Sequence, residues 1–132
     1  MIFVDSSFWI AVLNEGDAHH AEAVPLLLAH GDRELVTSNH VRGETWTFLR
    51  SRRGHRLATA FVDRLARSSS TRVEFVSEAL EEEALRWLRR HDERPYSFVD
   101  ATSFMLMRSL KIREALAFDG DFSAAGFVEL RP

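Results

Sequence analysis

Short apolar segments alternate with longer helical segments along the whole chain, and this alternation constrains the fold more than any other feature. The short segments are too brief for helices and predict buried strands at residues 2–4, 35–37, 73–76, 115–118 and 127–128. Between them apolar residues recur at helical spacing, most clearly over 78–92 and 98–110. Strands that alternate with helices form a parallel sheet that is covered on both faces. The sequence therefore predicts an α/β fold, and its 132 residues fit a single domain, residues 1–132.

Polar residues, a proline and a glycine mark the expected ends of several helices. Ser6 or Ser7 should cap a helix after the first strand, and Asp17 should cap the next one. Pro25 lies inside the second helical pattern and predicts a kink or a break there. Gly54 should end the helix that follows the second strand.

The composition excludes several kinds of chemistry and of location. The chain has no cysteine, which rules out disulfides, thiolate zinc sites and cysteine nucleophiles. No basic residue precedes Asp5, unlike in a signal peptide, and no apolar run approaches the roughly 20 residues that span a bilayer. We therefore expect a soluble, cytoplasmic protein without membrane association.

Positive charge is concentrated in one segment, although the formal net charge of the chain is −3. Residues 42–67 contain two acids, Glu44 and Asp63, and seven arginines: Arg42, Arg50, Arg52, Arg53, Arg56, Arg64 and Arg67. A basic segment of this kind can bind phosphates. Taken alone, it is better explained as a solvated helix face.

Two aspartates are expected at the carboxyl ends of strands. Asp5 directly follows the strand at 2–4, and Asp119 directly follows the strand at 115–118. A turn or a helix cap explains either residue by itself. In open parallel sheets, however, ligands bind beyond the carboxyl ends of the strands, where the strand order reverses.

Two further acids lie on helices that should face the protein. Glu44 shares a helix face with Val41 and Thr45, so we expect it to point inward and to need a cation or a donor as partner. An ion pair with an arginine would also satisfy it. Asp100 lies near the start of the strongly apolar helix at 98–110, where the helix dipole favours a negative charge.

Together these acids predict a metal site. Asp5, Glu44, Asp100 and Asp119 should converge at one edge of the sheet, where like charges repel unless a cation lies between them. Ligation by oxygen alone, without cysteine or paired histidines, favours Mg²⁺ or Mn²⁺ over zinc.

Four short motifs, in order and spread over nearly the whole chain, resemble those of PIN-domain ribonucleases. They are Val4-Asp5-Ser6-Ser7, Arg42-Gly43-Glu44-Thr45-Trp46, Ser97-Phe98-Val99-Asp100-Ala101 and Phe118-Asp119-Gly120-Asp121-Phe122. The resemblance implies a three-layer α/β/α sandwich with a mostly parallel five-stranded sheet and hydrolysis of RNA phosphodiester bonds with Mg²⁺ or Mn²⁺. It gives Asp5, Glu44, Asp100 and Asp119 the catalytic and metal-binding roles, with Asp121 as an auxiliary metal ligand.

A free-standing chain of this size resembles the toxin half of VapBC-type toxin–antitoxin pairs. That resemblance implies an RNA substrate, a homodimer and a small antitoxin protein as partner. Two other functions stay open at this point. One is a non-catalytic PIN-like module that binds proteins. The other is a phosphatase-like hydrolase that uses Asp5, although such enzymes carry Asp-x-Asp where this chain has Asp5-Ser6-Ser7.

Overall fold

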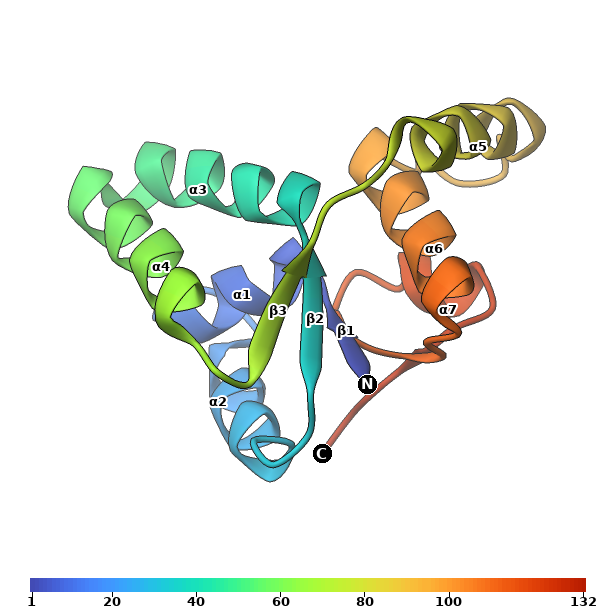
Figure 1. Ribbon diagram of the computed structural model, residues 1–132. Coiled ribbons are helices and arrows are strands. Elements are labelled where there is room, and N and C mark those ends of the chain that lie inside the picture. The colour runs from blue at the N-terminus through green and yellow to red at the C-terminus, as the bar shows by residue number, and fades with distance from the viewer.

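The computed structural model describes residues 1–132 as five strands and seven helices in alternation (Figure 1). The strands are β1 (Ile2–Val4), β2 (Leu35–Ser38), β3 (Thr71–Glu74), β4 (Glu114–Leu116) and β5 (Val128–Glu129). The helices are α1 (Ser6–Leu13), α2 (His20–Ala29), α3 (Asn39–Arg53), α4 (His55–Arg67), α5 (Glu78–Arg90), α6 (Phe98–Leu110) and α7 (Asp121–Ala124). No helix is both long and apolar enough to cross a membrane.

The five strands form one parallel sheet in the order β3-β2-β1-β4-β5. Helices α1 to α4 lie on one side of it and α5 to α7 on the other, which gives three layers (Figure 1). The predicted α/β/α sandwich is thus confirmed. The chain runs outward from β1 to β2 and β3, then returns to place β4 on the other side of β1. The strand order therefore reverses between β1 and β4, and this is where such sheets bind ligands.

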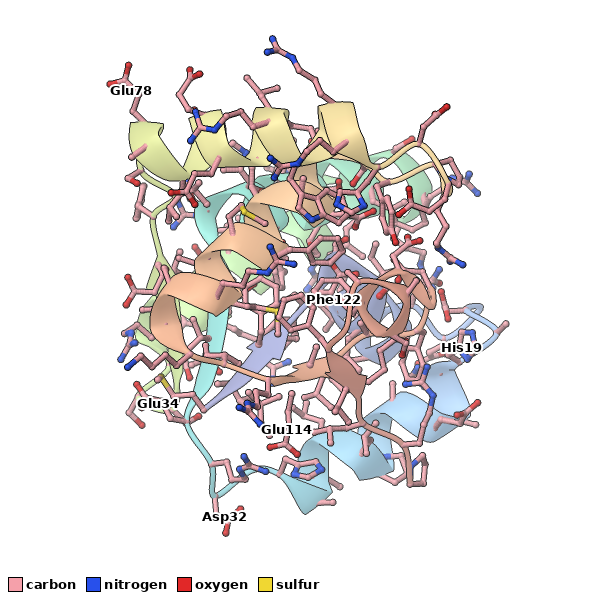
Figure 2. All side chains as sticks on the ribbon, turned by 90° about the vertical axis from the view of Figure 1, so that its right-hand side faces the viewer. His19, Asp32, Glu34, Glu78, Glu114 and Phe122 are labelled. Carbon is pink, nitrogen blue, oxygen red and sulfur yellow. The ribbon has the colours of Figure 1, made fainter.

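The central strands are buried on both faces, as their apolar sequences require. Ile2, Phe3 and Val4 of β1 have no exposed surface. Phe122 packs between the sheet and α6 (Figure 2). Its ring lies 6.0 Å from that of Phe3 in β1 and 5.0 Å from that of Phe104 in α6. This contact anchors the short helix α7, which the sequence pattern did not predict.

Two strands differ from their expected bounds by two residues. β3 covers Thr71–Glu74 rather than 73–76, because it pairs with β2 from Leu35↔Thr71 to Ser38↔Glu74. Phe75 therefore lies beyond the strand and is 65% exposed. β4 ends at Leu116 rather than at 118, because the next residues turn toward α1 and the backbone N–H of Phe118 donates to Ser7 Oγ (3.1 Å).

Two expectations about the starts of helices were wrong. Asp5, and not Ser6 or Ser7, caps α1, because its carboxylate accepts from the backbone N–H of Ser7. Asp17 accepts instead from the N–H of His19 (2.8 Å) in the turn before α2, and α2 has no side-chain cap. Of the kink or break expected at Pro25, the break does not occur, because α2 continues through this residue. Gly54 ends α3 with a φ of 102°, as expected for a glycine stop.

Candidate metal centre

Asp5 is buried at the carboxyl end of β1 and is only 2% exposed. Its Oδ2 accepts hydrogen bonds from the backbone N–H of Ser7 (3.1 Å) and from Ser7 Oγ (2.7 Å). Its other oxygen, Oδ1, is buried and has no hydrogen-bond partner in the protein. A buried carboxylate oxygen without a donor is costly, so this atom needs a ligand.

Asp100 is fixed by the start of α6 and is 7% exposed. Ser97 caps this helix: its side chain accepts from the N–H of Asp100 (2.9 Å), while Asp100 Oδ2 accepts from the N–H of Ser97 (2.9 Å). This reciprocal capping box holds the carboxylate in one orientation. It also explains part of why an acid stands here, since one of its oxygens stabilises the helix end.

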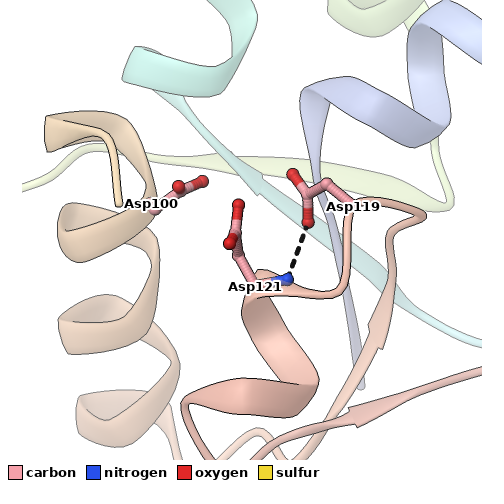
Figure 3. Close-up of side chains that lie close together, drawn as sticks. All are labelled: Asp100, Asp119 and Asp121. Atoms are coloured by element: carbon pink, nitrogen blue, oxygen red, sulfur yellow. Dashed lines mark hydrogen bonds between the residues drawn. The ribbon is translucent and has the colours of Figure 1, made fainter. Parts of the chain in front are cut away.

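Asp119 lies on the turn between β4 and α7, Asp121 is the first residue of α7, and Figure 3 shows their carboxylates next to that of Asp100. Ligand oxygens of the three aspartates lie within 4.8 Å of one another. Gly120 sits between them with a φ of 80°, which only glycine adopts without strain. The carboxylate of Glu129 in β5 stabilises the turn, because it accepts hydrogen bonds from the backbone N–H groups of Gly120 (3.3 Å) and Ser123 (2.8 Å).

Asp119 and Asp121 have different partners. Asp119 Oδ1 accepts from the backbone N–H of Asp121 (3.1 Å). Asp121 forms an ion pair with Arg94, whose Nε and Nη2 lie 3.0 and 2.9 Å from Asp121 Oδ1. Arg94 is the cation that the sequence reasoning missed, because nothing in the pattern of the loop before α6 links it to a residue 27 positions away.

Glu44 differs from its expected environment. It lies on an exposed position of α3, although Thr45 next to it is buried, so the expectation that it points into the protein was wrong. The reason is that the buried face of α3 is narrow and passes through Val41, Thr45 and Leu49. Glu44 nevertheless belongs to the same edge, because its Oε1 accepts a hydrogen bond from Ser6 Oγ, next to Asp5.

Burial and neighbouring charges raise the pKa of the carboxyl groups at this edge. Burial raises the pKa of Asp5 from 3.8 to about 7, and the charges of Asp119 and Asp100 add to the rise. Burial also raises the pKa of Asp100 to about 6, with further contributions from Asp119 and Asp121. The pKa of Asp119 is raised as well, by partial removal from water and by the charge of Asp121. Carboxylates that resist ionisation in this way are typical of a site built for a cation.

The residues present fit a divalent metal ion. The donor set consists of carboxylate oxygens, which Mg²⁺ and Mn²⁺ prefer. Asp5 Oδ1 lacks a donor, and the oxygens of Asp100, Asp119 and Asp121 are near enough to share one ion.

Comparison with known proteins identifies the family. The family model of the PIN domain matches residues 2–128 of this chain. This chain belongs to the PIN domain family. PIN nucleases generally use a divalent metal, in agreement with the acidic cluster described above. The resemblance seen in the four sequence motifs is thus confirmed.

The chain is also similar to individual PIN proteins over its full length. It is 59% identical to the 23S rRNA-specific endonuclease VapC20 of Mycobacterium tuberculosis, in strains CDC 1551 / Oshkosh and ATCC 25618 / H37Rv, covering 100% of this chain and 99% of the relative. The crystal structure of Mycobacterium tuberculosis VapC20, described as a sarcin–ricin loop cleaving toxin, superimposes with a TM-score of 0.93 at 57% identity, covering 100% of both chains.

Proposed function

We propose that residues 1–132 form one nuclease domain, a metal-dependent endoribonuclease that cleaves 23S ribosomal RNA at the sarcin–ricin loop. The observation that carries this proposal is the unpartnered, buried oxygen of Asp5 at the strand-order reversal, beside three further aspartates. The substrate is proposed from the similarity to VapC20 over the full chain. Such an RNA substrate also favours action in the cytoplasm.

The proposed metal ligands are Asp5, Asp100 and Asp119, with Mg²⁺ or Mn²⁺ as the ion. Asp5 offers Oδ1, since Oδ2 is taken by Ser7. Asp100 offers the oxygen that does not accept from Ser97. Asp121 is proposed as auxiliary, because Arg94 already neutralises it. When bound, the cation would polarise the scissile phosphate and a water molecule.

The side chains of this protein would orient the attacking water molecule and accept its proton. Glu44 is exposed at the edge of the cluster and anchored through Ser6, so it can orient a water molecule that enters from solvent and accept its proton. Asp5 caps α1, and Asp100 takes part in the capping box of α6, so both carboxylates are held in fixed positions. Fixed carboxylates do not have to reorganise during the reaction. Removing either charge should therefore affect the rate more than the fold.

We also propose that the protein is the toxin of a VapBC-type pair, that it forms a homodimer, and that a small antitoxin protein inhibits it. These partner proposals follow from the similarity to VapC20, which is described as a toxin. Expression of the wild-type chain alone should arrest growth, and expression of the Asp5→Asn variant should not. Equal growth with both would contradict the toxin role.

The cleavage proposal is tested with ribosomes and purified protein. Primer extension across the sarcin–ricin loop should give a new stop with Mg²⁺ or Mn²⁺ and none with EDTA. A matched variant, Asp32→Asn, changes an exposed turn acid at the opposite edge of the sheet and should cleave like the wild type. Cleavage that persists in EDTA would contradict the metal-dependent reaction, and intact ribosomal RNA in all samples would contradict the substrate.

A further inference from the structure

A groove runs along α3, beginning at the acidic cluster. Its lining comes from one stripe of α3, which includes Gly43, Glu44, Thr47, Phe48, Ser51 and Arg52, and from Val99 at the start of α6. Glu44 belongs to both the groove and the candidate metal centre, and Val99 precedes Asp100. In Figure 1, α3 begins beyond the carboxyl end of β2 and extends away from the sheet. The groove therefore leads from the site of proposed cleavage outward along this helix.

Gly43 occupies an unusual position in this groove. It is the fifth residue of α3, so it is neither a cap nor a stop, and its φ is not positive. Glycine destabilises a helix interior, and it is normally retained there for close packing or a special backbone angle. Neither reason applies here: a Cβ at position 43 would meet nothing within 4 Å, and the residue is exposed. The space above Gly43 is thus open for something outside this chain.

The chemistry around Gly43 fits a nucleic-acid strand. Of the four arginines of α3, Arg52 lines the groove, whereas Arg42 lies over the ring of Phe75 and Arg53 donates to Asn14. The guanidinium of Arg52 lies 5.3 Å from the centre of the Phe48 ring, which places a cation and an aromatic face together in the groove. Thr47 and Ser51 add hydroxyl groups on the same stripe. Proteins hold unpaired nucleotides by basic side chains that contact the backbone and by aromatic rings on which the bases stack.

We propose that this groove binds the unpaired nucleotides next to the scissile bond, and that Gly43 keeps the helix surface bare so that the sugar–phosphate backbone can pass against it. The proposal rests on the proposed ribonuclease function and adds the path of the substrate. It explains why α3 keeps a destabilising residue beside Glu44. Phe48 and Arg52 would then hold a base and a phosphate farther along the strand.

The test replaces Gly43 with side chains of increasing size. Gly43→Ala and Gly43→Gln should each raise the Tm by about 3 °C, because both residues favour a helix more than glycine does. Binding of a fluorescein-labelled RNA hairpin with the sarcin–ricin loop sequence, measured by anisotropy in EDTA, should weaken with side-chain size, reaching a Kd at least about tenfold higher for Gly43→Gln. The increase in Tm on adding Mn²⁺ should stay as in the wild type.

The control is Gly31→Ala, the same substitution in the turn before β2. Its Cβ would meet only ordinary contacts, at 3.5 and 3.7 Å, and its φ is not positive. It should leave RNA binding unchanged. A blunt RNA duplex of equal length should bind more weakly than the hairpin and should not discriminate among the position-43 variants.

Several results would overturn the inference. An unchanged Kd for Gly43→Gln, or a loss of stability in both variants, would show that the space above Gly43 is not a substrate path. A change of mass in light scattering would make the groove a subunit interface instead. If hairpin binding weakens from wild type to Gly43→Ala to Gly43→Gln, yet wild type never cleaves the hairpin with Mn²⁺, the proposed function fails while the proposed role of the groove stands.

Discussion

Replacing Asp5 with asparagine should change the stability of the metal-free protein, relative to wild type, more favourably at pH 8 than at pH 4. The folded-state pKa of Asp5 is about 7, above its ordinary value of 3.8, so the folded protein holds a proton that the unfolded chain releases. Stability from this residue is therefore complete below pH 4 and is lost as the pH rises through 7. At roughly 1.4 kcal/mol per pH unit, the loss amounts to about 4 kcal/mol.

Asparagine keeps the shape of Asp5 but carries no charge at any pH. It also weakens the hydrogen bonds from Ser7, a cost that does not depend on pH. The informative quantity is therefore the difference in Tm between Asp5→Asn and wild type, measured in EDTA at pH 4 and at pH 8. For a chain of this length, about 4 kcal/mol corresponds to a change of roughly 10–15 °C in that difference.

The exposed variant Asp32→Asn serves as the control and should show no such dependence on pH. Adding Mn²⁺ at pH 8 should raise the Tm of wild type through binding to the folded state, and Asp5→Asn should lose most of this increase. A Tm difference that is constant between pH 4 and 8 would refute the reasoning about burial and charge at Asp5. So would an equal Mn²⁺ effect on both proteins.

Further predictions concern the other carboxylates and their supports. Glu44→Gln, Asp100→Asn and Asp119→Asn should each lower the rate of RNA cleavage at least about 100-fold without unfolding the protein, as followed by gel assay and circular dichroism. Asp121→Asn should lower the rate less than Asp119→Asn; the reverse order would exchange their roles. Affinity for Mn²⁺, measured by calorimetry, should fall as the pH drops from 7 to 5, because ligands with raised pKa values must first lose protons. Ser7→Ala should destabilise the fold by about 1–2 kcal/mol in urea titrations, since the Ser7 hydroxyl no longer donates to Asp5 or accepts from the backbone N–H of Phe118.

Much of the fold was predictable because local patterns and burial agree. The helix at 98–110 has the predicted bounds, since Ser97 is a strong cap and the apolar run is uninterrupted. The order of strands and helices and the parallel sheet also followed from the pattern. Edge strands were harder to predict, because the register with a neighbour decides their ends: β3 stops at Glu74, and the apolar Phe75 and Val76 lie outside it.

The candidate site was predictable in its residues but not in its supports. Asp5, Asp100 and Asp119 lie at the expected edge because strand ends and helix starts meet there. The exposure of Glu44 could not be read from helical spacing, since the buried face of α3 is narrower than the apolar pattern suggests. The pairing of Arg94 with Asp121 depends on how a loop folds back over a distant turn, which no local pattern encodes.

The most direct test of the central claim is to locate the metal. Crystals soaked in Mn²⁺ should give an anomalous peak about 2.0–2.3 Å from Asp5 Oδ1 and within reach of Asp100 and Asp119. The same soak of Asp5→Asn crystals should leave this position empty. A peak elsewhere on the molecule, or none at this edge of the sheet in the wild type, would contradict the account.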